Sequence, residues 1–105
     1  MFNSAYSLWA ANDKSELFDK LNDASQQGID TYRMMGPRSN SSDRFIFDMW
    51  VNFVERILRE IDSKYGTSYL WKFNFAKYLS RGDLKDNFLD ALKALTEIMR
   101  DFSKV

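Results

Sequence analysis

Along most of the chain, apolar residues recur at intervals of three and four positions, which is the repeat of one face of an α-helix. The pattern is strongest in residues 43–65, where the apolar arc covers about half of the helix circumference. This arc is wider than a surface helix needs, so we expect residues 43–65 to form the central helix, with neighbours on two sides. The arc consists of Ile46, Met49, Trp50, Phe53, Val54, Ile57, Leu58 and Ile61, with Phe47 and Val51 at its edge.

A second helix is expected before the central one, beginning at Asp13. Asp13 and Glu16 have the spacing of a capping box, in which each side chain bonds a free backbone amide of the first turn. The helix should end near Met35, because Pro37 disfavours the helical conformation of the residue before it. Residues 1–12 would then form a short helix or an ordered arm. The apolar face of this helix carries Leu17, Phe18, Leu21, Ala24, Gly28, Ile29, Tyr32 and Met35.

The C-terminal stretch has the clearest one-sided pattern. Asp83 is a favourable residue at a helix start, and an apolar stripe about 120° wide follows it. Between this stretch and the central helix, Gly66 suits the left-handed position that follows a helix end. The stripe consists of Leu84, Phe88, Ala91, Leu92, Leu95, Ile98, Met99 and Phe102.

Residues 69–81 are dense in aromatic side chains and fit two patterns. Every second residue from Tyr69 to Phe75 is aromatic, as in a β-strand. The segment also fits two helical stripes, and a lone strand has no partner in this chain. We therefore predict a helix, with Thr67 or Ser68 as its capping residue. The two stripes are Tyr69/Phe73/Ala76 and Trp71/Phe75/Tyr78.

These segments together predict an all-α protein. We expect one domain over residues 1–105, built as a compact bundle of four to five helices with short connections. The length is that of a single small domain. Apolar residues make up 45% of the chain and include three Trp and nine Phe, which supplies enough large side chains for a core.

The composition removes the commonest catalytic groups. The chain has neither histidine nor cysteine, so it offers no imidazole base, no thiolate nucleophile and no His or Cys metal ligand. We therefore predict a protein that is not an enzyme and uses no cofactor or metal. An enzyme based on carboxylates and a metal is a remote alternative. Its candidate carboxylate pairs are Asp19/Asp23 and Asp86/Asp90, which lie on predicted solvent-facing sides, where plain solvation explains them better.

The chain shows no targeting pattern. Residues 1–11 lack the basic start and the long apolar run of a signal peptide. No stretch is apolar for long enough to span a bilayer. We expect a cytoplasmic protein that does not associate with membranes.

Charge is balanced, with 15 basic and 15 acidic residues, but it is segregated along the chain. Residues 63–82 hold four basic residues and no acidic one, and five aromatics lie among them from Tyr69 to Tyr78. Cations bind phosphates and aromatic faces stack on unpaired bases, so this combination points to single-stranded nucleic acid. The alternative, favoured by the zero net charge, is that the aromatics belong to the core. The candidate contacts to nucleic acid are Lys72, Lys77 and Arg81.

Three arginines surround the polar loop between the first two long helices. Arg33, Arg38 and Arg44 could hold an anion such as phosphate if the two helix ends meet there. The loop lacks the glycine pattern of a phosphate-binding loop, so an ordinary exposed turn is the alternative that we favour.

Several apolar residues are candidates for a contact with a partner protein. Methionine adapts to irregular surfaces, and aromatic side chains are enriched at interface hot spots. For each of these residues, filling the core is the alternative. The candidates are Phe2, Tyr6, Trp9, Met34, Met35 and Trp71.

The sequence therefore favours a non-catalytic helical interaction module, as a small subunit or adaptor of a larger protein or nucleoprotein assembly. The alternative is an inhibitor or immunity-type protein, such as mobile elements encode, that blocks one protein partner. A homodimer is compatible with both, because the wide apolar arc of residues 43–65 exceeds what one short chain readily covers.

Overall fold

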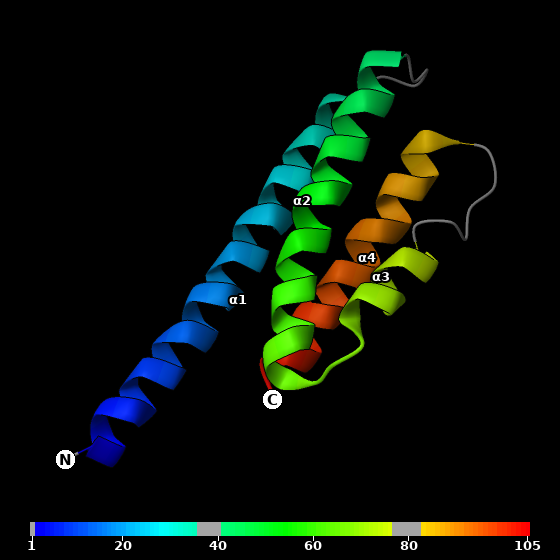
Figure 1. Cartoon of the computed structure of the whole chain (residues 1–105). Helices are drawn as coiled ribbons and strands as arrows, with labels where there is room; N and C mark the ends of the chain where they lie inside the picture. The colour runs from blue at the N-terminus through cyan, green and yellow to red at the C-terminus, as the bar shows by residue number, and fades with distance from the viewer. Residues whose placement is uncertain (1, 36–40, 77–82) are drawn as a thin grey trace.

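The protein is an all-α bundle of four helices in the part of the chain that the structure describes (Figure 1). The computed structural model describes the backbone of residues 2–35, 41–76 and 83–105, and the side chains of these residues except 2–13 and 41. The helices run alternately up and down, and α4 lies antiparallel to α1 (Figure 1). The helices are α1 (Phe2–Met34), α2 (Ser41–Tyr65), α3 (Tyr69–Ala76) and α4 (Leu84–Phe102).

The longest helix, α1, passes without interruption through the position where the sequence predicted a helix start. The capping-box prediction at Asp13 and Glu16 is wrong, because both residues lie within one helix of 33 residues. Residues 2–12 belong to the same helix, so they form neither a separate short helix nor an arm. An Asp at a helix interior position costs only a fraction of a kcal/mol relative to Ala, so the same residues are compatible with a continuous helix. The N-terminal end of α1 extends beyond the other three helices (Figure 1).

The core confirms the apolar faces expected for α1 and α4. Leu17, Leu21 and Ala24 of α1 are buried, as is the main apolar stripe of α4. Aromatic rings form two clusters in this core. One joins Trp50 to Phe47, Phe73 and Phe88, and the other joins Phe102 to Phe18, Tyr65 and Tyr69.

Gly28 allows α1 and α2 to approach closely. A Cβ atom at this position would lie 2.6 Å from Cζ2 of Trp50 and 2.7 Å from Cδ2 of Leu92. The glycine that interrupts the apolar face of α1 is therefore a packing residue, and the helix continues through it. The Trp50 Nε1 also donates a hydrogen bond of 2.8 Å to the backbone oxygen of Ala24, which lies one turn before Gly28 on α1.

The connection from α2 to α3 is fixed by a side chain of α2. Gly66 has the positive φ of +67° that the sequence predicted after the helix end. Ser68 stands at the N-cap position of α3, where its backbone oxygen accepts from the amide of Lys72, but the side-chain acceptor at this helix start is Asp62. Its carboxylate accepts from the backbone amides of Tyr69 at 2.9 Å and Leu70 at 3.0 Å.

The short helix α3 has the two stripes expected for residues 69–76. Tyr69 and Phe73 are buried, whereas Trp71 and Phe75 are exposed. The helix assignment is confirmed over these residues, and the positions beyond Ala76 lie outside the described part of the chain. At the start of α4, Asp83 is the N-cap as expected, and its side chain accepts from the amide of Lys85.

Candidate interaction surfaces

The face of α2 next to α1 presents large apolar side chains to solvent. The predicted apolar arc of α2 is buried at Trp50, Val54 and the positions that follow the same stripe. Three of its members, Ile46, Met49 and Phe53, stay exposed. We call these three residues, together with Met34 at the end of α1, the α2 strip. Their exposed fractions are 44% for Ile46, 58% for Met49, 42% for Phe53 and 86% for Met34.

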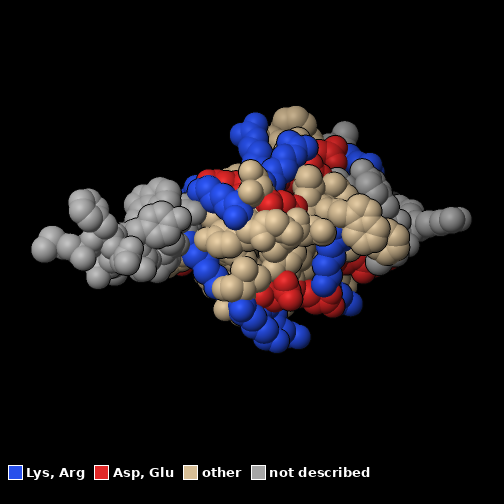
Figure 2. All heavy atoms as spheres, turned by 60° about the horizontal axis from the view of Figure 1, so that its bottom comes forward, with Lys and Arg blue, Asp and Glu red and all other residues tan. Residues whose placement is uncertain are grey.

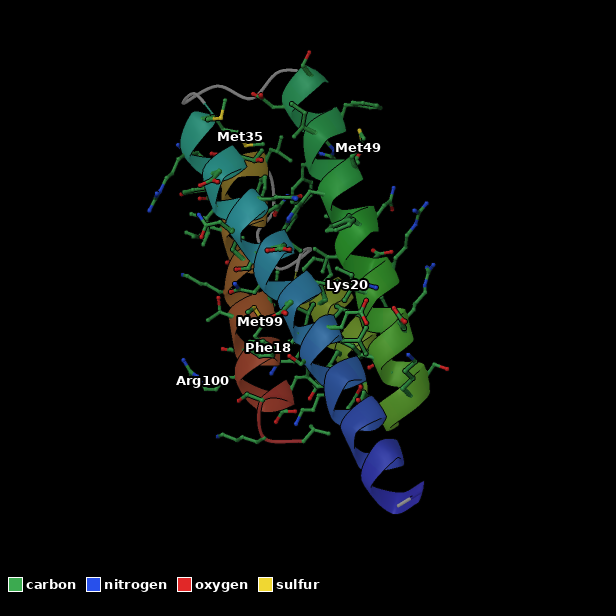
Figure 3. All side chains as sticks on the ribbon, turned by 90° about the vertical axis from the view of Figure 1, so that its left-hand side faces the viewer. Phe18, Lys20, Met35, Met49, Met99 and Arg100 are labelled. Atoms are coloured by element: carbon green, nitrogen blue, oxygen red, sulfur yellow. The ribbon has the colours of Figure 1, made fainter. Side chains whose placement is uncertain are left out.

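Shallow hollows follow the α2 strip along its length. One lies between the end of α1 and the start of α2, and is lined by Met34 and Ile46. The next two share Phe53 and Arg56. Figure 3 shows Met49 and Lys20 on the same side of α1, facing away from the side where α4 lies. The α2 strip is thus a row of apolar side chains beside a helix seam.

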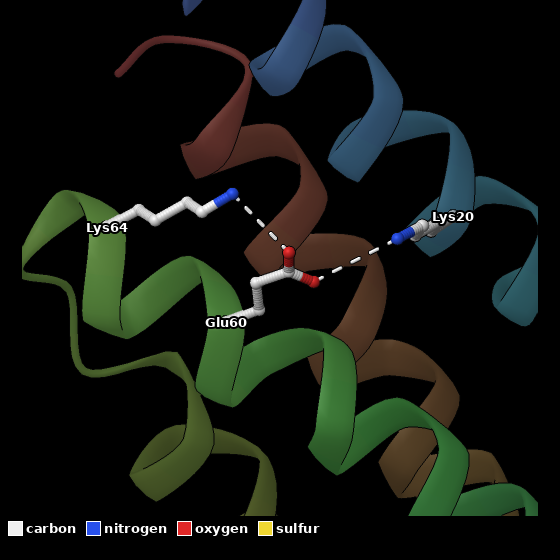
Figure 4. A network of polar contacts seen from close by, with 3 residues as sticks. All are labelled: Lys20, Glu60 and Lys64. Carbon is white, nitrogen blue, oxygen red and sulfur yellow. Dashed lines mark hydrogen bonds and ion pairs between the residues drawn. The ribbon is translucent and has the colours of Figure 1, made fainter.

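Three charged side chains of this seam form a network of ion pairs. Glu60 of α2 contacts Lys20 of α1 at 3.9 Å and Lys64 of its own helix at 3.4 Å, as drawn in Figure 4. All three side chains are about half exposed, so this network contributes little to stability. It does give Lys20 and Lys64 an acidic partner inside the same molecule.

A second exposed apolar site lies on α3. The rings of Trp71 and Phe75 stack on each other, with centroids 5.5 Å apart and an angle of 13° between the planes. Both rings are more than half exposed. The expectation that these aromatics fill the core is therefore wrong for this stripe of α3, although it holds for Phe73.

The predicted anion contacts do not form one cluster among the described residues. Lys72 pairs with Glu97 of α4 at 3.3 Å, and Arg44 pairs with Asp48 one turn along α2 at 3.9 Å. Arg33 is exposed on α1 and faces α4 across a groove. Arg38, Lys77 and Arg81 lie outside the described residues.

The predicted partner contacts divide in the same way. Met34 and Trp71 are exposed, so they are available to a partner. Met35 is only 7% exposed and packs in the core, so its assignment to a surface is wrong. The side chains of Phe2, Tyr6 and Trp9 lie outside the described residues.

A groove between α1 and α4 was not expected from the sequence. It is a hollow of about 340 Å³ with a mainly apolar surface. Two cations, Arg33 and Lys93, belong to its lining, and neither forms an ion pair within the described part of the chain. We call it the α1/α4 groove. Its lining consists of Ser25, Ile29, Tyr32, Arg33, Leu89, Leu92, Lys93 and Thr96.

The titratable groups of the described residues offer one clear perturbation, and it is structural. Tyr69 is buried and donates a hydrogen bond to Asp101 of α4. Burial first, then this hydrogen bond and the charges of Asp101 and Asp62, raise the pKa of Tyr69 well above its ordinary value. The tyrosine joins α3 to the end of α4 as a neutral donor.

The carboxylate pairs of the remote enzyme hypothesis lie on the outside of the bundle. Asp19, Asp23 and Asp86 are exposed and Asp90 is partly exposed. No group of three or more acidic residues with the proximity of a metal site occurs among the residues described. None of the described helices is apolar over a length that would cross a bilayer.

The surface charge is mixed on the face that Figure 2 presents. Acidic and basic side chains alternate there around a central area of uncharged residues. No broad patch of one sign, of the kind that tracks a nucleic-acid backbone, is visible on that face.

No known protein family matches the sequence, and neither a curated protein nor a solved structure shows detectable similarity to the chain.

Proposed function

We propose that the protein is a non-catalytic helical interaction module, acting as a small subunit or adaptor that binds a protein partner. The observation that supports this most directly is the α2 strip. Four large apolar side chains on two adjacent helices lie within reach of one partner surface and remain outside the core. A contiguous exposed apolar surface of this kind is typical of interaction sites.

The chemistry of the strip suits a protein partner better than a polyanion. Burial of methionine and phenylalanine side chains lowers the free energy by about 25 cal/mol for each Å² of apolar area removed from water. Met34 and Met49 adapt to irregular partner surfaces because their side chains are unbranched and flexible. Lys20, the cation of α1 beside the strip, is already paired with Glu60.

The test compares two substitutions of equally exposed residues. Met49 and Phe75 are both 58% exposed, one in the strip and one on α3. The tagged protein, M49D and F75D are used in quantitative pull-downs from a lysate of the source cells. We expect M49D to lose a specific partner that F75D retains. Equal retention of all partners by M49D would contradict the proposal.

The same experiment separates an adaptor from the inhibitor or immunity-type alternative. An adaptor co-purifies with several proteins in fixed ratios, whereas an inhibitor retains one tight partner. A homodimer is a third outcome, in which M49D shifts the sedimentation coefficient of the purified protein to that of a monomer.

One observation favours a second candidate function, the binding of single-stranded nucleic acid. The outer faces of the stacked Trp71 and Phe75 rings could receive unpaired bases. Salt-dependent binding of a single-stranded oligonucleotide, lost in W71A and F75A, would support this function. Absence of binding even at low salt would remove it.

A further inference from the structure

We propose that the α1/α4 groove is a docking site for an acidic amphipathic helix of a protein partner. The inference extends the proposed interaction function to a second surface, on the opposite side of α1 from the α2 strip (Figure 3). The proposal for the α1/α4 groove can therefore fail while the α2 strip still binds its partner, and the proposal for the α2 strip can fail while the groove still binds a helix.

The first support is the distribution of ion pairs between helices. Lys20 and Glu60 pair across the seam of α1 and α2, and Lys72 and Glu97 pair across α3 and α4. Across α1 and α4, the described residues form no such pair. Within the described part of the chain, Arg33 and Lys93 of this seam thus lack an acidic partner of the kind that Lys20 and Lys72 have.

The second support is the alignment of the cations. On α4, Leu89, Lys93, Thr96 and Arg100 follow each other at helical spacing and share one face. Arg100 projects from α4 on the side of Phe18 and Met99 (Figure 3). On α1, Arg33 adds a cation to the lining of the groove. The nearby Asp30 does not pair with Arg33, but accepts a hydrogen bond from Gln26.

The third support is the floor of the groove. Ile29 and Leu89 are only partly buried, and they lie between the cationic rims. Tyr32 is held in place on the floor, because the Lys85 ammonium lies 5.1 Å from its ring centroid and the Phe88 ring meets it edge-on. An occupant that satisfies both floor and rim must carry an apolar stripe with acidic residues beside it.

The length of the charged row selects a segment rather than a small molecule. Arg100 lies one turn beyond Thr96, the last α4 residue of the groove lining, and seven residues from Lys93, which on a helix is about 10 Å. An occupant facing both cations must therefore span about two helical turns. A third helix lying in the groove of two antiparallel helices meets this requirement and covers Ile29 and Leu89 as well. A nucleic-acid backbone would neutralise the cations but leave the apolar floor exposed.

The test uses two synthetic helical peptides of about 18 residues, or five turns. Both have the same leucine face, and the remaining positions are glutamate in one and lysine in the other. A single-stranded oligonucleotide is the third probe. Binding is measured by fluorescence anisotropy, and the site is mapped by amide chemical shifts on isotope-labelled protein. We expect the glutamate peptide to bind and to shift the amides of α1 and α4 around Ile29 and Leu89.

Two variants and one matched control locate the interaction. R33E/K93E should weaken binding of the glutamate peptide by at least about tenfold, because charges on the rim reverse. R44E/R59E makes the same change in net charge on exposed side chains of α2 and should leave the affinity within about twofold. L89S tests the floor without a change of charge and should also weaken binding.

The outcomes that overturn the inference are distinct. Equal binding of both peptides would mean unspecific apolar contact, and equal affinity of R33E/K93E and R44E/R59E would mean that the groove is not the site. Binding of the oligonucleotide in the groove without an effect of L89S would assign the cations to a polyanion. M49D serves to separate this site from the α2 strip, since it should leave peptide binding unchanged.

Discussion

The indole Nε1 of Trp50 donates a hydrogen bond of 2.8 Å to the backbone oxygen of Ala24 across the seam of α2 and α1. The ring lies against Gly28, so the absence of a side chain there is what allows the indole to reach the carbonyl. Helix-to-helix distance, ring position and hydrogen bond are therefore set together. Trp50 also contacts the rings of Phe73 and Phe88, which extends this arrangement to α3 and α4.

We expect Gly28→Ala to destabilise the protein, although alanine is the better helix former. The helical preference contributes about 1 kcal/mol in favour of alanine. Against this, the new Cβ would lie 2.6–2.7 Å from atoms of Trp50 and Leu92, and such overpacking costs about 1–3 kcal/mol. The measurement is the free energy of unfolding in urea. A variant more stable than the parent would contradict the packing role of Gly28.

The coupling between the two residues is tested by a double-mutant cycle. Trp50→Phe removes the hydrogen bond and the ring atoms nearest Gly28, and should cost about 1 kcal/mol for the bond plus a contribution from the smaller ring. In this background, Gly28→Ala should be less harmful, because part of the clash is gone. Strict additivity of the two changes would show that the close contact carries no energy.

Substitution of Asp62, a partly exposed carboxylate at the end of α2, is expected to lower the stability of the protein. Asp62→Ala removes the acceptor for the amides of Tyr69 and Leu70 and should cost about 1–2 kcal/mol. Asp48→Ala is the control, since Asp48 pairs with Arg44 at 3.9 Å on an exposed face, and it should change stability by less than about 0.5 kcal/mol. Chemical denaturation of both variants decides the matter, and equal effects would refute the capping role.

The raised pKa of Tyr69 predicts a loss of stability at alkaline pH. Burial and the hydrogen bond to Asp101 raise its folded-state pKa, whereas in the unfolded chain it ionises near pH 10. The stability that this shift contributes is fully present below about pH 10 and is lost as the pH rises toward the folded pKa, because only the unfolded state releases the proton. Unfolding experiments across this range should show a steeper loss for the parent than for Tyr69→Phe. Identical slopes would contradict the shift.

The two stripes of α3 should respond differently to truncation. Phe73 is fully buried, so Phe73→Ala should cost about 3–5 kcal/mol. Trp71 is 69% exposed, so Trp71→Ala should change the free energy of unfolding by less than about 1 kcal/mol. Thermal unfolding followed by circular dichroism measures both. A large effect of Trp71→Ala would place its ring in the core and remove it from the candidate surfaces.

Much of the fold follows from the periodicity of the sequence. The apolar faces of α1 and α4 and the glycine at position 66 were predictable because each depends on local geometry. The break at Asp13 was predicted wrongly, because Asp and Glu three residues apart also occur on one face of an uninterrupted helix. The cap from Asp62 lies seven residues before Tyr69, beyond the range of local capping patterns.

The candidate surfaces were less predictable than the fold. The two stripes of α3 are equally apolar, so the sequence could not decide that Phe73 faces inward and Trp71 outward. The α2 strip was visible only as an arc of unusual width, since which part of the arc α1 covers depends on how the helices pack. The α1/α4 groove combines Arg33 with Lys93, which are 60 positions apart in the sequence and meet only through the fold.

The aromatic ring of Phe102 contacts Phe18 of α1, Tyr65 at the end of α2 and Tyr69 of α3. One residue near the end of α4 thereby joins all four helices. During synthesis, this cluster can close only after residue 102 has been added, so a growing chain with three finished helices still exposes the rings that Phe102 will cover. Folding of this bundle therefore requires the completion of α4. A nascent chain stalled before that point would expose apolar rings that chaperones can bind.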